Sequence, residues 1–182
     1  LKSYKTGETF FLEGDPVHSF FIVGSGRVKV FKLSPEGKEQ IVFIENHDMD
    51  RFASMETDVQ RQKLAASLMF YMGGVPSIYY GQEIGMQGKA NSYSNTDGND
   101  IGRREAFDWY QSGEGKGMAF WYKNTGDWWT NKNQKSNDGI SLEEQLKDPN
   151  SLFNFYKKII SIKQSNIALA KGRYENVQNN AA

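Results

Sequence analysis

The sequence predicts a mixed α and β fold, in which half of an antiparallel β-roll (residues 1–41) is followed by a β–α–β–α segment with parallel strands. Three observations predict this organisation. Glycine- and proline-rich turns divide short apolar runs before residue 41, and a helical period near 3.6 replaces this pattern afterwards. The two apolar strands that flank the first predicted helix are separated by the length typical of a βαβ crossover.

Residues 1–41 have the pattern of an antiparallel meander or roll. In residues 27–33, Val28 and Val30 alternate with Arg27 and Lys29, which predicts a strand with one buried face. Predicted strands occupy residues 9–12, 19–23, 27–33 and 38–44, with turns at 13–16, 24–26 and 35–37.

The next segment changes to a strand–helix–strand pattern. Residues 42–45 form a short apolar strand, and residues 57–72 form a helix whose Leu64, Leu68 and Met72 are spaced by four along one predicted apolar face. Gly73-Gly74 ends the helix, and residues 75–80 form the second strand. A right-handed crossover between two parallel strands is therefore predicted.

Two further helices and a long aromatic segment follow. Ser141 and Glu144 form a predicted capping box, and residues 151–164 form a helix with a strong apolar stripe. All four tryptophans lie within residues 107–129, where we expect most of them to pack and one or two at most to contact a ligand.

Composition argues against several classes of site. The formal net charge is zero without a block of like charges, which disfavours nucleic-acid binding and membrane-surface binding. The absence of cysteine excludes disulfides and cysteine nucleophiles, and the two histidines lack metal-ligand spacing. No apolar run approaches the roughly 20 residues of a membrane helix. We therefore predict no cofactor, no metal site, no nucleic-acid partner and no membrane partner, while the cellular location stays open.

The polar residues Asn46, His47 and Asp48 directly follow the strand at 42–45. Groups at the carboxyl ends of parallel barrel strands are placed where chemistry occurs, and a carboxylate beside an imidazole can bind sugar hydroxyls. The alternative is structural: Asn46 or Asp48 caps the next helix, and His47 is a polar turn residue. The residues alone leave both interpretations open.

Two motifs resemble the α-amylase family of glycoside hydrolases. Phe-Ile-Glu-Asn-His-Asp at residues 43–48, followed by Arg51, resembles the family's seventh barrel strand. Residues 74–86 resemble its eighth strand and following loop, and Arg-Glu-Ala-Phe-Asp-Trp at 104–109 resembles the segment that often comes next. The resemblance implies a piece of a TIM-type (β/α)₈ barrel over residues 42–168, followed at 169–182 by a tail or the start of the family's carboxyl-terminal β domain.

The same resemblance implies roles for individual residues. It makes Asp48 the carboxylate that stabilises the transition state and His47 a sugar-binding residue, with Asn46, Arg51 and Glu83 as further substrate contacts. The ligand would be an α-glucan or maltooligosaccharide. The family's nucleophile and general acid have no counterparts here, so a retaining glycosidase that is inactive as an isolated chain is expected. The complete family can bind calcium, but no calcium site is predicted in this chain.

Residues 1–41 resemble the first half of a cyclic-nucleotide-binding domain of the cyclic-AMP receptor type. The resemblance rests on Gly-Glu at 7–8, Glu-Gly-Asp at 13–15 and Gly-Arg-Val-Lys-Val at 26–30. The phosphate-binding cassette is absent, so no nucleotide-binding residue is predicted. Two half-domains would expose apolar surfaces, through which the chain is expected to associate with itself. Three hypotheses stay open: an amylase fragment, a cyclic-nucleotide-sensing module, and a structural chimera without activity.

Overall fold

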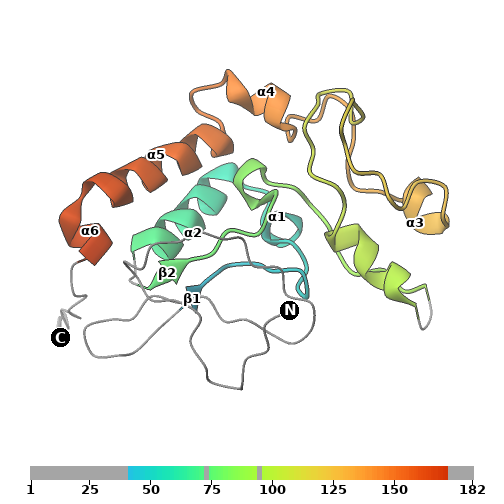
Figure 1. The fold of residues 1–182 in the computed structure, drawn as a ribbon, viewed down its shortest axis with the longest axis horizontal. Helices are drawn as coiled ribbons and strands as arrows, with labels where there is room; N and C mark the ends of the chain where they lie inside the picture. Colours follow the sequence, from blue (N-terminus) through green and yellow to red (C-terminus); the bar gives the residue numbers. More distant parts are fainter. Residues whose placement is uncertain (1–40, 72–73, 94–95, 172–182) are drawn as a thin grey trace, which may run out of the picture.

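A computed structural model of the chain describes residues 41–71, 74–93 and 96–171 (Figure 1). The predicted β-roll therefore lies, apart from Ile41, outside the described residues. In chain order the elements are β1 (Ile41–Val42), α1 (Phe52–Met55), α2 (Val59–Tyr71), β2 (Val75–Pro76), the 3₁₀ helices η1 (Gln82–Ile84) and η2 (Asp97–Arg103), α3 (Asp127–Thr130), α4 (Leu142–Leu146), α5 (Leu152–Ser165) and α6 (Ile167–Lys171). None of the helices in these ranges is long and apolar enough to span a membrane.

Strands β1 and β2 pair in parallel, with Ile41 opposite Val75 and Val42 opposite Pro76. The amide of Ser77 extends the pairing by donating to the carbonyl oxygen of Val42 at 2.8 Å. The predicted parallel crossover is confirmed, although both strands are shorter than predicted. The antiparallel pairing predicted for the strand at 38–44 is wrong in its described part, because Ile41 pairs with the parallel strand β2.

The core forms where α5 lies alongside α2, on one side of the two strands (Figure 1). Tyr156 of α5 packs its ring edge against Phe70 of α2, with the ring centroids 6.2 Å apart. The core members are Ala66, Met69 and Phe70 from α2 and Leu152, Tyr156 and Ile159 from α5, with Val42, Ile44 and Ile78 packed against them from the strand segments. The apolar stripe predicted for the helix at 151–164 is confirmed.

Helix α2 buries a different face from the predicted one. Leu64 and Leu68 are 60% and 50% exposed, whereas Gln62, Ala66, Met69 and Phe70 are buried. Met72 lies outside the described residues. Leu64 and Leu68 each lie two residues from the fully buried Ala66, about 200° around the helix. They are therefore on the side of α2 that is turned away from α5.

Polar caps hold the carboxyl-terminal helices in place. The Ser141 hydroxyl accepts from the amide of Glu144 at 3.3 Å, and the Glu144 carboxylate accepts from the amide of Ser141 at 3.2 Å, which confirms the predicted capping box. Gln145 of α4 then donates to the Ile84 carbonyl at 2.8 Å and accepts from the Phe153 amide at 3.1 Å. A single side chain thus joins α4 to η1 and α5.

We expect Ile159→Ala to lower the free energy of unfolding by about 2–5 kcal/mol, because it opens a cavity between α2 and α5. Urea denaturation followed by circular dichroism measures this. Ile162→Ala, on the exposed side of the same helix, is the matched control and should cost less than about 1 kcal/mol. Equal losses in the two variants would contradict the assigned core.

Candidate functional site

The predicted residues Asn46, His47 and Asp48 form a turn after β1, in which His47 and Asp48 are exposed and Asn46 is half-buried. The Asp48 amide donates to Asn46 Oδ1 at 2.8 Å, and His47 Nε2 lies 3.2 Å from Asp48 Oδ2. Neither Asn46 nor Asp48 caps the next helix, since the N-cap of α1 is Arg51 and no side-chain cap bond is present. The helix-capping interpretation is therefore wrong, and the turn is free to present His47 and Asp48 to solvent.

Two arginines from the end of η2 hold this turn from the other side. Arg104 Nη2 contacts Asp48 Oδ1 at 3.0 Å, and Arg104 Nε donates to the His47 carbonyl at 2.9 Å. Arg103 Nη1 donates to the Asp48 carbonyl at 2.8 Å. The sequence analysis did not identify Arg103 as part of the site and used Arg104 only for the family resemblance, although adjacent arginines three and four residues after Asp100 were a usable signal.

Two further carboxylates complete the charged cluster. Asp100 contacts Arg103 Nη2 and lies 3.0 Å from Arg104 Nη2. The hydrogen bond from Arg103 lowers the pKa of Asp100, and the positive charges of both arginines add to this effect. Asp50 accepts from the Ala90 amide at 2.8 Å and lies 3.9 Å from Arg103. Through Arg103 and Arg104, these contacts link the end of η2 to the turn at residues 46–48.

Arg51, which the sequence predicts as a substrate contact, is fully buried. Its Nη1 lies 3.2 Å from Glu45 Oε1 and donates to the Tyr80 carbonyl at 2.6 Å, and its Nε donates to the Arg103 carbonyl at 3.1 Å. The guanidinium also lies over the ring of Tyr79, 4.4 Å from its centroid. Protein groups enclose Arg51, so the structure gives it a role in the fold, and its predicted substrate contact stays a prediction.

Glu45 is the ion-pair partner of Arg51, and Glu83 interacts with Arg51 through its charge. Burial raises the pKa of Glu45, and the hydrogen bond from the Phe52 amide and the Arg51 charge oppose that rise. Burial likewise raises the pKa of Glu83, whose Oε2 has no hydrogen-bond partner. The electrostatic neighbours of Glu83 are Arg51 and Glu45. The structure thus joins His47 and Asp48 but does not bring Glu83 into contact with them, and its predicted substrate contact stays a prediction.

Asp108 is a second unusual carboxyl group, which the sequence analysis did not single out. Its side chain is completely buried, and no described donor meets either oxygen with good hydrogen-bond geometry. Burial raises the pKa of Asp108 to about 7, and the negative charges of Asp138 and Glu144 add to the rise. The nearby Tyr110 amide partly opposes this rise in the pKa. Its carbonyl oxygen accepts from the Leu142 amide at 2.9 Å, so this carboxyl group lies where the aromatic segment meets α4.

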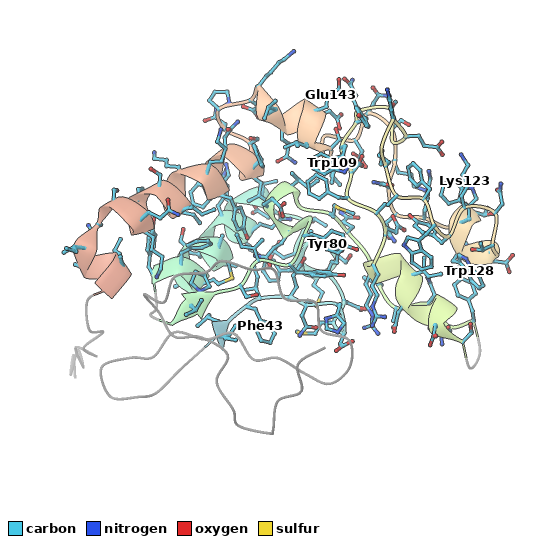
Figure 2. The ribbon with its side chains drawn as sticks, viewed as in Figure 1. Phe43, Tyr80, Trp109, Lys123, Trp128 and Glu143 are labelled. Atoms are coloured by element: carbon cyan, nitrogen blue, oxygen red, sulfur yellow. The ribbon has the colours of Figure 1, made fainter. Side chains whose placement is uncertain are left out.

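The aromatic segment provides both packing and exposed rings. Trp128 packs edge-on against Tyr93, and Trp129 packs against Phe120 and Tyr122. Trp109 and Trp121 are exposed, and Figure 2 shows Trp109 on the side of α4 and Trp128 in α3. Within the described ranges, no group of three or more histidine, cysteine, aspartate or glutamate side chains could hold a metal ion.

Comparison with known proteins places these features in context. Residues 27–172 match the family described as "Alpha amylase, catalytic domain". Alpha-amylase 3 of Dictyoglomus thermophilum is 32% identical over 139 residues, which cover 75% of this chain and 25% of that protein. A 4-alpha-glucanotransferase of Thermotoga maritima is 35% identical over 117 residues, which cover 62% of this chain and 23% of that protein. The crystal structure of an alpha-amylase from H. orenii aligns with a TM-score of 0.62 and 28% identity over 78% of this chain and 26% of that one.

The chain thus spans about a quarter of the length of these relatives. The family match includes residues 27–41, for which the sequence analysis predicted a β-roll. None of these matches supports the resemblance to a cyclic-nucleotide-binding domain.

We expect Arg51→Met and Glu45→Gln each to lower the free energy of unfolding by about 3–5 kcal/mol, because either change leaves buried polar groups without their partner. Chemical denaturation measures the losses. The matched control is Arg61→Met, which removes an exposed pair with Glu56 and should cost less than about 1 kcal/mol. Losses at Arg51 and Glu45 as small as the control would contradict the role of the buried pair.

Asp108 should make stability depend on pH. An unfolded aspartate loses its proton near pH 4, whereas folded Asp108 keeps it to about pH 7, so its contribution is full below pH 4 and is lost as pH rises to about 7. We expect Asp108→Asn to be more stable than the wild type at pH 8, by on the order of 4 kcal/mol, and similar to it at pH 4.

Thermal and urea unfolding from pH 4 to pH 8 measure this difference. Asp127→Asn, at an exposed position in the same aromatic segment, is the control and should follow the wild-type profile. A constant difference between Asp108→Asn and the wild type across this range would contradict the assignment of a buried neutral acid.

Proposed function

The chain belongs to the α-amylase family, and from this premise we propose that its Asn46–His47–Asp48 turn supplies part of an active site for α-glucans. One observation carries the proposal. The turn presents the Asp48 carboxylate to solvent, 66% exposed, while His47 and Arg104 contact its two oxygens. An exposed carboxylate that is nevertheless held in place is suited to act on a bound ligand.

Asp48 is proposed to stabilise the positive charge that develops on the sugar ring during glycosidic bond cleavage. A carboxylate held in place before the reaction can stabilise an oxocarbenium-like transition state without further reorganisation. His47 is proposed to hydrogen-bond a sugar hydroxyl beside it. The Asn46 carboxamide oxygen accepts from the Asp48 amide and fixes the turn. The substrate contact predicted for Asn46 is kept as part of the proposal.

The nucleophile and the general acid are proposed to come from another polypeptide that supplies the remaining barrel strands. Retaining glycosidases place these two carboxyl groups about 5 Å apart. Asp100, which shares Arg104 with Asp48, is already bound by two arginines and is therefore a poor candidate for either role. We accordingly propose that this chain alone does not hydrolyse glucans.

The α-glucan ligand is proposed because the relatives named above include an alpha-amylase and a 4-alpha-glucanotransferase. Association with itself or with other parts of an amylase barrel is proposed from the exposed apolar side chains Phe43, Leu64 and Leu68. A fused origin of the amino-terminal residues remains a proposal from their sequence. Cyclic-nucleotide sensing is not proposed, since no described residue supports it.

The test is hydrolysis in trans. The chain is mixed with the part of the Dictyoglomus thermophilum relative that precedes the region matched by this chain, light scattering records assembly, and a chromogenic maltooligosaccharide records hydrolysis. We expect no hydrolysis by the chain alone, hydrolysis by the assembled mixture, and a loss of about 10²–10³-fold for Asp48→Asn.

Asp127→Asn, distant from the turn in sequence and exposed, should keep the rate of the unaltered mixture. An assembled mixture that hydrolyses the substrate equally well with Asp48→Asn would contradict the proposed role of Asp48.

A further inference from the structure

We infer that Arg104 is a positioning residue that holds Asp48 and the 46–48 turn in one orientation. The inference rests on the proposed function of that turn and adds to it a residue from a different part of the chain. Arg104 follows η2, 56 residues from Asp48 in the sequence. Its effect on a glucan would act through Asp48 and His47.

The guanidinium of Arg104 contacts both the side chain and the backbone of the turn. Its Nη2 reaches Asp48 Oδ1 at 3.0 Å, and its Nε donates to the His47 carbonyl at 2.9 Å. The planar, delocalised guanidinium fixes the angle between these two bonds, which the single ammonium group of lysine cannot do. Arg104 therefore restrains the Asp48 rotamer and the path of the turn together.

Arg104 can act as a restraint because its own position is fixed. Asp100 Oδ2 lies 3.0 Å from Arg104 Nη2, and the same aspartate contacts Arg103. The backbone of the preceding residue, Arg103, is fixed as well, since its carbonyl accepts from the buried Nε of Arg51 at 3.1 Å.

The end of η2 is also packed tightly against residues 88–91. A Cβ atom at Gly88 would collide with the Gly102 carbonyl oxygen, and one at Gly102 would collide with the Lys89 carbonyl oxygen. The Asn91 amide donates to the Asn99 carbonyl at 2.7 Å. The restraint on Asp48 thus starts from a part of the backbone with little room to move.

Without Arg104, His47 would be the one described side chain in contact with the largely exposed Asp48 carboxylate, while Arg103 would still hold the Asp48 carbonyl. Ordering a free side chain and a turn costs conformational entropy, which would then oppose sugar binding. A carboxylate has about four acceptor positions, so contacts with Arg104 and His47 leave positions for sugar hydroxyl groups. The arrangement therefore lowers the cost of binding without blocking the ligand.

The first test measures order in the ligand-free chain. Backbone ¹⁵N order parameters of His47 and Asp48 should be near 0.85 in the wild type, measurably lower in Arg104→Gln, where Arg103 still holds the Asp48 carbonyl, and intermediate in Arg104→Lys. The melting temperature should stay within about 2 °C in all three, because exposed ion pairs contribute little stability. Arg61→Gln removes an exposed arginine pair in α2 and should change neither quantity.

Order parameters below about 0.6 in the wild type, or unchanged values in Arg104→Gln, would overturn the inference. The second test adds maltoheptaose and follows the amide signals of residues 46–48. We expect Arg104→Gln to weaken binding about tenfold or more and Arg104→Lys to restore part of it.

The two proposals fail in different ways. If the wild-type turn is ordered and Arg104→Gln lowers its order parameters, but maltoheptaose moves none of these signals, the glucan proposal is contradicted and the positioning role of Arg104 is supported. If the wild type and Arg104→Gln bind maltoheptaose equally, the glucan proposal is supported and the positioning inference is overturned.

Discussion

The buried ion pair between Glu45 and Arg51 is the interaction on which the arrangement of the other segments depends. Two buried charges lose their hydration and are tolerated only when nearby groups replace it. Here the replacements come from separate segments: the Phe52 amide at the start of α1 donates to Glu45, while the carbonyl groups of Tyr80 and Arg103 accept from Arg51. The requirement to satisfy these two charges therefore fixes the strand ends, the first helix and η2 relative to one another.

This requirement links the interior of the molecule to the exposed turn. Arg51 holds the Arg103 backbone, and the next residue, Arg104, holds the Asp48 side chain. Arg51, at one end of this series of contacts, is held rigidly in the interior, and Asp48, at the other end, is accessible to a ligand. The family motif at residues 43–51 therefore contains exposed and buried polar residues. Asp48 and His47 face the solvent, whereas Glu45 and Arg51 are buried and stabilise the fold.

Local sequence signals predicted the parts of the structure that depend on neighbouring residues. The capping box at Ser141, the apolar stripe of α5, the parallel crossover and the proximity of His47 and Asp48 all follow from spacing along the chain. Contacts between distant segments were not predictable in this way. An arginine after a motif is ordinarily expected at the surface, and spacing could not show that Arg51 lies between Tyr79 and Glu45. The burial of Asp108 and the approach of Arg104 likewise depend on contacts over tens of residues, and the buried face of α2 depends on where α5 packs.

The central claim is that the Glu45–Arg51 pair holds these segments together, and native-state hydrogen exchange tests it most directly. The Phe52 amide donates to Glu45 at 2.6 Å, and the Arg51 amide donates to the Gly88 carbonyl at 2.8 Å. The account predicts that both amides exchange only through global unfolding, at the rate of the core amides of α2 and α5. Exchange of these two amides at the faster rate of exposed loop amides, while α2 and α5 stay protected, would contradict it.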